Sequence, residues 1–161
     1  MESFATQTVL AMTITDYLVE QRVPFEELPH PPAFSASKLA KYLRVSGGEV
    51  AKAVLLHGPA GFFLTVLPAT LQADLAKLAV QQGGPVRLAT TDEIVATFRD
   101  CEWGVVSPFG NLYGLATLID DAIASRAWIV IEAGTHVDAV RLSARDFERL
   151  AGCQRGSFAC S

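Results

Sequence analysis

The first half of the chain alternates between two spacings of its apolar residues. Before Pro24 they recur every three or four positions, which predicts a helix over residues 5–22. A second helix is predicted within residues 30–43, after a Pro-Pro turn, with Ser35 or Ser37 as its N-cap. Runs of strand-forming residues predict strands over residues 23–28, 50–58 and 61–69.

The second half continues this mixture of helices and strands. Capping residues and apolar spacing predict helices over residues 71–84, 90–98 and 143–152. Strands are predicted over residues 85–89, 115–120, 128–134 and 139–143. Several strand pairs suit hairpins, so we expect the α/β class with mixed α+β character, in which helices pack around a mixed sheet.

Composition narrows the class of protein. The chain has 161 residues, 50% of them apolar, and no linker-like stretch, so we expect one domain over residues 1–161 with a frayed tail at 153–161. No apolar run is long enough to span a membrane, and the first residues lack a basic signal-peptide region. The cysteines, odd in number and without a CxxC pair, suit reduced thiols and a cytoplasmic location.

The net charge of −4 argues against broad, non-specific binding of nucleic acid. It leaves room for a local group of cations. Lys38, Lys41 and Arg44 recur every third residue and share one side of the predicted helix, and Arg87 follows in a strand. These residues are either an ordinary solvated surface or contacts for a few phosphates.

Lys52 lies on an apolar face of the strand over residues 50–58. Side chains of a strand alternate between its two faces, so Lys52 shares a face with Val50, Val54 and Leu56. A buried ammonium group is costly without a partner or water. Lys52 is therefore either an edge-strand lysine that discourages aggregation or a cation at a pocket rim, directed at a phosphate, carboxylate or carbonyl oxygen.

Residues 104–110, GVVSPFG, combine permissive and stiff backbone positions. Gly104 allows a ligand to approach closely, Pro108 favours an extended Ser107, and Gly110 permits a positive φ. Such a loop either connects two elements tightly or presents its N–H groups to a ligand oxygen. Both interpretations fit the sequence.

Three other kinds of site are disfavoured. Ser107 is not the nucleophile of a GxSxG elbow, because Val105 and Phe109 stand where that motif has glycine. Cys101 has no signature of a thiol nucleophile around it. Cys101 and the three histidines also lack the spacing of zinc ligands, so neither a metal nor another cofactor is expected.

Several segments occur in a characteristic order: HPP at residues 30–32, AKAVLL at 51–56, GVVSPFG at 104–110 and EAGTH at 132–136. With them the chain resembles the YbaK-like family, also called the prolyl-tRNA synthetase-associated or INS editing-domain superfamily. The resemblance implies a largely antiparallel mixed sheet curled into a barrel-like core. It also implies hydrolysis of the ester between a wrong amino acid and the 3′-terminal ribose of a tRNA, expected here in trans, with an aminoacyl-tRNA synthetase as a further partner.

The resemblance assigns roles to particular residues. The implied catalytic residues, which contact the terminal adenosine and hold the scissile ester, are Lys52, Gly104, Val105, Val106, Ser107 and Pro108. The implied substrate-binding residues around the amino-acid pocket are His30, Pro31, Phe109, Gly110, Gly134 and His136. The implied contacts to the tRNA acceptor end are Lys38, Lys41, Arg44 and Arg87. Without the resemblance, His136 equally suits an ordinary structural histidine.

Ala53 and Trp103 reshape the expected pocket, so no one member's amino-acid preference is carried over. Small acyl groups such as alanine, serine, threonine and cysteine are the expected substrates, because a pocket excludes larger groups by size. In the family a ribose hydroxyl activates the water. Here Lys52 would anchor the substrate, and the N–H groups of residues 105–107 would hold the ester oxygen.

Three alternatives stay open. The alternatives to an editing deacylase are a non-catalytic module that binds aminoacyl-tRNA or nucleotide ends, a hydrolase that uses Cys101, and a protein-interaction domain. The editing hypothesis requires Lys52 and residues 105–107 to border one narrow cavity.

Overall fold

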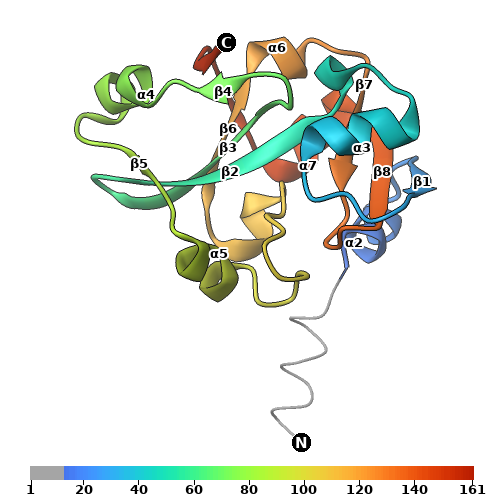
Figure 1. Cartoon of the computed structure of the whole chain (residues 1–161). Coiled ribbons are helices and arrows are strands. Elements are labelled where there is room, and N and C mark those ends of the chain that lie inside the picture. Colours follow the sequence, from blue (N-terminus) through green and yellow to red (C-terminus); the bar gives the residue numbers. More distant parts are fainter. Residues whose placement is uncertain (1–12) are drawn as a thin grey trace, which may run out of the picture.

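The structure, a computed structural model, describes residues 13–161, without the side chains of residues 36 and 37 (Figure 1). The strands are β1 (Glu26–Pro29), β2 (Ala51–Gly58), β3 (Gly61–Pro68), β4 (Gln72–Ala73), β5 (Arg87–Leu88), β6 (Ala116–Asp120), β7 (Trp128–Glu132), β8 (Asp138–Ser143), β9 (Gln154–Gly156) and β10 (Ala159–Cys160). The α-helices are α2 (Ile14–Glu20), α3 (Ala36–Leu43), α4 (Leu75–Gln82), α5 (Thr91–Thr97), α6 (Asp121–Ala124) and α7 (Ala144–Ala151). Two short 3-10 helices are η1 (Gly47–Glu49) and η2 (Gly110–Tyr113).

A long antiparallel hairpin of β2 and β3 crosses the molecule and organises the larger sheet (Figure 1). This sheet has the strand order β5-β2-β3-β6-β9, antiparallel from β5 to β3 and parallel from β3 to β9. A second, antiparallel sheet has the order β1-β8-β7, and β4 pairs with β10. The predicted mixture of helices with a mixed sheet is confirmed.

The expected barrel-like closure is not found among residues 13–161. The two main sheets stay separate and meet at an isolated parallel bridge between Val50 and Val130. Beyond this bridge the strands part, because β2 continues along β3 while β7 continues along β8. A barrel needs an unbroken ladder around its circumference, and a single bridge does not provide one.

Polar caps fix where the helices begin. Thr13 and Thr90 close capping boxes with an acidic residue three positions on, and Ser35 and Ser143 cap α3 and α7. Residues 5–12 of the first predicted helix lie outside the described residues. Among residues 13–161, no helix combines the length and the apolar character needed to cross a bilayer.

Buried clusters lie on both sides of the bridge. The larger contains Phe109 and Phe147 together with inward-facing residues of β7 and β8. The smaller packs α3 through Leu39 against Val50 and Val130. Burial of one such side chain stabilises the fold by roughly 1.5–3 kcal/mol, so these contacts hold α3 over the bridge.

The C-terminal residues are ordered, and the expectation of a frayed tail at residues 153–161 is wrong. β9 pairs with β6, and β10 pairs with β4. Phe158 is fully buried, and the carboxylate of Asp120 accepts hydrogen bonds from the N–H groups of Phe158 and Ala159 at 2.8 and 2.7 Å. One apolar anchor and one buried carboxylate therefore fasten a segment whose composition is otherwise typical of a tail.

Candidate functional site

A cavity of about 170 Å³ opens beside the point where β2 and β7 part. The start of β2 supplies one wall with residues 50–53. Phe34, which precedes α3, and Glu132, which ends β7, contribute further wall. The facing loop contributes Gly104, Val106 and Pro108. The structure thus brings Lys52 and three of the predicted loop residues around one cavity.

Lys52 projects from β2 and pairs across the hairpin with Leu67. It is half-buried, and burial lowers the pKa of its ammonium group. None of the ion pairs found within residues 13–161 involves Lys52. An ammonium group that borders a cavity without a carboxylate in contact is available to a ligand anion or carbonyl oxygen.

The loop offers fewer free amides than expected. Gly104 adopts a positive φ of 85°. The N–H of Val105 donates to the carbonyl oxygen of Glu102 at 3.0 Å, so it is not available to an ester oxygen. Within residues 13–161, no acceptor is found for the amides of Val106 and Ser107. Of residues 105–107, Val106 alone lines the cavity and has an amide without an acceptor in the described part of the chain.

Ser107, Phe109 and Gly110 serve the packing of the loop. The hydroxyl of Ser107 is buried and accepts a hydrogen bond from the N–H of Phe109 at 3.3 Å. Phe109 is fully buried between Tyr17 and Phe147, with ring centroids 5.4 and 5.0 Å away. No part of its side chain reaches the surface, so the predicted contact of Phe109 with substrate finds no support in its position.

Gly110 does not adopt the positive φ that its sequence position suggested. The positive φ that ends η2 is instead that of Gly114. A Cβ at Gly110 would collide with the hydroxyl of Thr117. Glycine is needed here because the backbone packs closely against Thr117 and Leu115.

His136 and Gly134 lie in the turn between β7 and β8, behind the cavity wall. The Nε2 atom of His136 is 3.0 Å from the carbonyl oxygen of Trp103, and its ring packs against that of Phe34 with 4.5 Å between ring centroids and 42° between the ring planes. The carbonyl oxygen of Gly134 accepts from the N–H of Glu102 at 2.8 Å. These residues position the loop and the Phe34 side chain.

His30 and Pro31 connect the segment before α3 to the same turn. The N–H of His30 donates to the carbonyl oxygen of Val137, and the N–H of Ala33 donates to that of His136. The Nδ1 atom of His30 is 2.7 Å from the carbonyl oxygen of Pro31. Neither His30 nor Pro31 lines the cavity, so both act at a distance from it.

The four predicted RNA-binding cations do not form one surface. Lys38 and Lys41 are exposed on α3, and Arg44 follows as its C-cap with a φ of 55°. Arg87 lies in β5, on the far side of the molecule from α3 (Figure 1). Its guanidinium donates two hydrogen bonds to the carboxylate of Glu93, at 2.8 and 3.0 Å, which raise its pKa. Arg87 is thus tied to α5 and does not extend the lysine surface.

Sequence reasoning missed Glu132 and Phe34. Glu132 shares a face of β7 with Val130, as Lys52 shares a face of β2 with Val50, so the same alternation argument applies to it. Burial raises the pKa of Glu132, with a further contribution from Glu102. Phe34 follows a Pro-Pro turn, and no sequence pattern distinguishes it from a core residue.

Cys101 is unsuited to nucleophilic chemistry. Its Sγ atom lies 3.5 Å from the hydroxyl of Tyr113 and 3.8 Å from a carboxylate oxygen of Asp100. Burial raises the pKa of the thiol to about 11, so the group is protonated near pH 7. Within the described part of the chain, no cluster of His, Cys, Asp and Glu suits a metal ion.

A family model described as an aminoacyl-tRNA editing domain matches residues 30–150. The chain is also 26% identical over 92 residues to the proline–tRNA ligase of Thermotoga sp. (strain RQ2), a match over 56% of this chain and 16% of the ligase. It is 30% identical over 88 residues to the proline–tRNA ligase of Pseudothermotoga lettingae, over 54% of this chain and 15% of the ligase. The matched region spans about a sixth of the length of these relatives.

Two solved structures share the fold. A proposed trans-editing enzyme for prolyl tRNA synthetase superposes with a TM-score of 0.70 at 21% identity, over 85% of this chain and 87% of that one. The hypothetical protein APE2540 superposes with a TM-score of 0.79 at 20% identity, over 91% and 99% of the two chains. At such identities the likeness concerns the fold alone. Because the family model covers most of the sequence, the chain belongs to the aminoacyl-tRNA editing domain family.

Proposed function

We propose that the protein is a trans-acting aminoacyl-tRNA deacylase that removes a small, wrongly attached amino acid. One observation carries the proposal: Lys52 and three residues of the facing loop, Gly104, Val106 and Pro108, border a single cavity. The family match supports chemistry on aminoacyl-tRNA. The proline–tRNA ligase relatives make tRNA for proline the first tRNA to test.

The site suits ester hydrolysis without a protein nucleophile. Water adds to the acyl carbon, the bond from this carbon to the ribose oxygen breaks, and a proton passes to that oxygen. The products are a free amino acid and a tRNA with both ribose hydroxyls restored. The amide of Val106 stabilises the oxyanion, and Lys52 holds the nucleotide. The neighbouring ribose hydroxyl of the substrate orients the water.

The cavity selects by size. A small acyl group and a water fit within its volume of about 170 Å³. An apolar pocket discriminates one additional methylene by only roughly 1–3 kcal/mol and rejects an added hydroxyl poorly, so it separates alanine from serine poorly. We therefore propose a group of small amino acids, namely alanine, serine, threonine and cysteine, as candidate acyl groups.

The surroundings of the cavity suit an unpaired RNA end. Phe34 and Trp103 are large aromatic residues with 72% and 69% of their surface exposed. Phe34 lines the cavity, and Trp103 directly precedes Gly104. Exposed aromatic rings stack on splayed bases, and the exposed Lys38 and Lys41 supply charge for nearby phosphates. Together they would receive the last nucleotides of the acceptor end.

The decisive experiment is deacylation by Lys52→Ala on a panel of mischarged tRNAs for proline, alanine, serine and threonine. We expect wild-type protein to hydrolyse at least one small aminoacyl ester. In the variant kcat/KM falls at least about tenfold, because the substrate loses its anchoring cation. Release of the labelled amino acid over time measures the rate.

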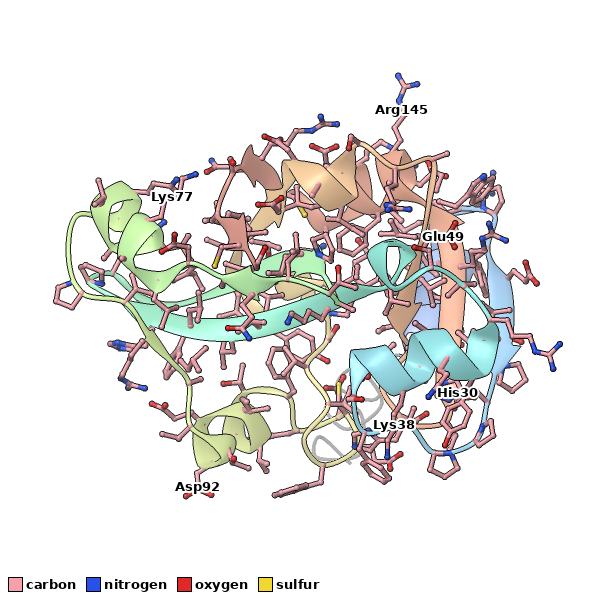
Figure 2. All side chains as sticks on the ribbon, turned by 45° about the horizontal axis from the view of Figure 1, so that its top comes forward. His30, Lys38, Glu49, Lys77, Asp92 and Arg145 are labelled. Atoms are coloured by element: carbon pink, nitrogen blue, oxygen red, sulfur yellow. The ribbon has the colours of Figure 1, made fainter. Side chains whose placement is uncertain are left out.

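Lys77→Ala is the matched control, because Lys77 is an exposed lysine on α4. Figure 2 shows Lys77 and Lys38 on opposite sides of the molecule, and the control should retain wild-type activity. Undiminished hydrolysis by Lys52→Ala would refute the anchoring role. Wild-type protein that protects mischarged tRNA from spontaneous hydrolysis would instead identify a non-catalytic binding module.

A further inference from the structure

Glu132 and Lys52 face the same cavity from two strands that have just separated. Val50 and Val130 form the bridge, and each charged residue follows its valine by two positions, on the same face of its strand. Beyond the bridge Lys52 stays with β3 and Glu132 with β8. An anion and a cation therefore border one small space from different walls.

Glu132 has no partner in the fold formed by residues 13–161. Its carboxylate takes part in none of the ion pairs there and in none of the side-chain hydrogen bonds around it. Burial raises its pKa, the nearby His136 opposes the shift, and Glu102 adds to it. A partly buried carboxylate without a donor costs stability, and a neutral side chain would fill the same strand position. The packing of the fold does not account for a carboxylate here.

We infer that Glu132 binds the α-ammonium group of the aminoacyl moiety and restricts hydrolysis to esters with a free amine. This inference rests on the proposed function. An α-amino group is protonated below about pH 7.7–8.0. Its nitrogen is two bonds from the acyl carbon, so a substrate whose carbonyl oxygen meets the loop carries its ammonium into the same cavity. Lys52 repels that ammonium, and Glu132 attracts it.

This contact fixes the orientation of the acyl group. With the ammonium at Glu132 and the carbonyl oxygen at the amide of Val106, the side chain of the amino acid points to the remaining wall. Leu39 and Val50 make part of that wall apolar. N-acylated esters, such as peptidyl-tRNA, have no positive charge for Glu132 and are excluded as substrates.

The test compares alanyl-tRNA with N-acetyl-alanyl-tRNA, using wild-type protein and Glu132→Gln. We expect wild-type kcat/KM to be at least about tenfold higher on the free amine. Glu132→Gln loses about ten- to hundredfold on the free amine and changes little on the acetylated ester, since a charge-assisted hydrogen bond is removed from one substrate alone. Glu20→Gln, an exposed carboxylate at the end of α2, should resemble wild type on both.

Equal losses on the two esters overturn the inference, because a merely structural role is insensitive to the amine. Binding of 3′-alanylamino-3′-deoxyadenosine and of its N-acetyl form separates this result from failure of the deacylase proposal. These amides resist hydrolysis, so they report recognition without turnover. Preference of wild type for the free amine, abolished in Glu132→Gln, supports the contact even if no ester is hydrolysed. Equal affinity of wild type for both amides refutes it.

Unfolding at two pH values shows that the variant folds. The pKa of Glu132 is raised in the folded state, so folding favours the protonated side chain. The resulting stabilisation is complete below the unfolded pKa of about 4.3 and is lost as the pH rises through the folded pKa. A glutamine side chain does not ionise, so its contribution to stability does not change over this range. The stability of Glu132→Gln relative to wild type should therefore increase between pH 4 and pH 7, as measured by urea unfolding.

Discussion

Gly104 shows how one residue sets the shape of the loop. Its φ is 85°, and no atom outside its chain neighbours lies within 4 Å of the place where a Cβ would stand. The cost of a side chain there is therefore conformational and not steric, roughly 1–2 kcal/mol for an L-residue in the left-handed region. The loop would relieve this strain by moving, and its amides would move with it.

Gly104→Ala should therefore reduce deacylation strongly, at least about tenfold, while it lowers stability by roughly 1 kcal/mol. Gly83→Ala is the matched control. Gly83 has a φ of 79° and equally open space, but it caps α4 away from the cavity. It should lose the same stability and keep full activity, as measured by urea unfolding and by release of amino acid. Equal activity in the two variants would show that the loop conformation is irrelevant to catalysis.

The residues that sequence reasoning places at the cavity share a local signal. Lys52 is a charge on an apolar face, and Gly104 and Pro108 restrict the backbone around them. Phe109 and Arg87 carry no such signal, since their partners Phe147 and Glu93 belong to other elements, which only the fold brings into contact with them. Glu132 carries the same signal as Lys52, because it shares a strand face with the apolar Val130.

At the scale of elements, the long β2–β3 hairpin was predictable and the last two strands were not. The hairpin is dense in Val, Leu and Phe and turns at Pro59-Ala60-Gly61. β9 and β10 are three and two residues long, too short to show an alternating pattern. Their anchors are Phe158 and the carboxylate of Asp120, and nothing in the local sequence reveals that pairing.

Phe158→Ala should therefore destabilise the whole protein. Phe158 is fully buried against Leu56, Leu67 and neighbouring residues, and such truncations cost about 3–5 kcal/mol. For a chain of this size we expect the Tm to fall by roughly 10 °C, measured by circular dichroism. Cys160→Ser, an exposed change on β10, should leave the Tm nearly unaltered. A Tm drop below about 2 °C for Phe158→Ala would restore the frayed-tail interpretation.

At the scale of the whole molecule, the net charge of −4 makes RNA binding depend on a few local cations. The double variant Lys38→Ala/Lys41→Ala tests this with tRNA that carries no amino acid. The slope of log Kd against log salt concentration should decrease by about 0.7–0.9 for each lysine removed. Arg87→Ala should not change the slope, because its guanidinium is held by Glu93 far from α3. Filter binding between 50 and 200 mM salt measures both. An unchanged slope in the double variant would exclude α3 from the interface.

The bridge between Val50 and Val130 has a consequence for how specificity can change. The two sheets share one backbone bridge and a common buried core, so the side chains packed around the bridge set how far the strands separate beyond it. Leu39 of α3 packs with both valines and also lines the cavity, so its size affects the space left for an acyl group. A substitution in this helix would therefore change which acyl group fits, while Lys52 and the loop stay the same.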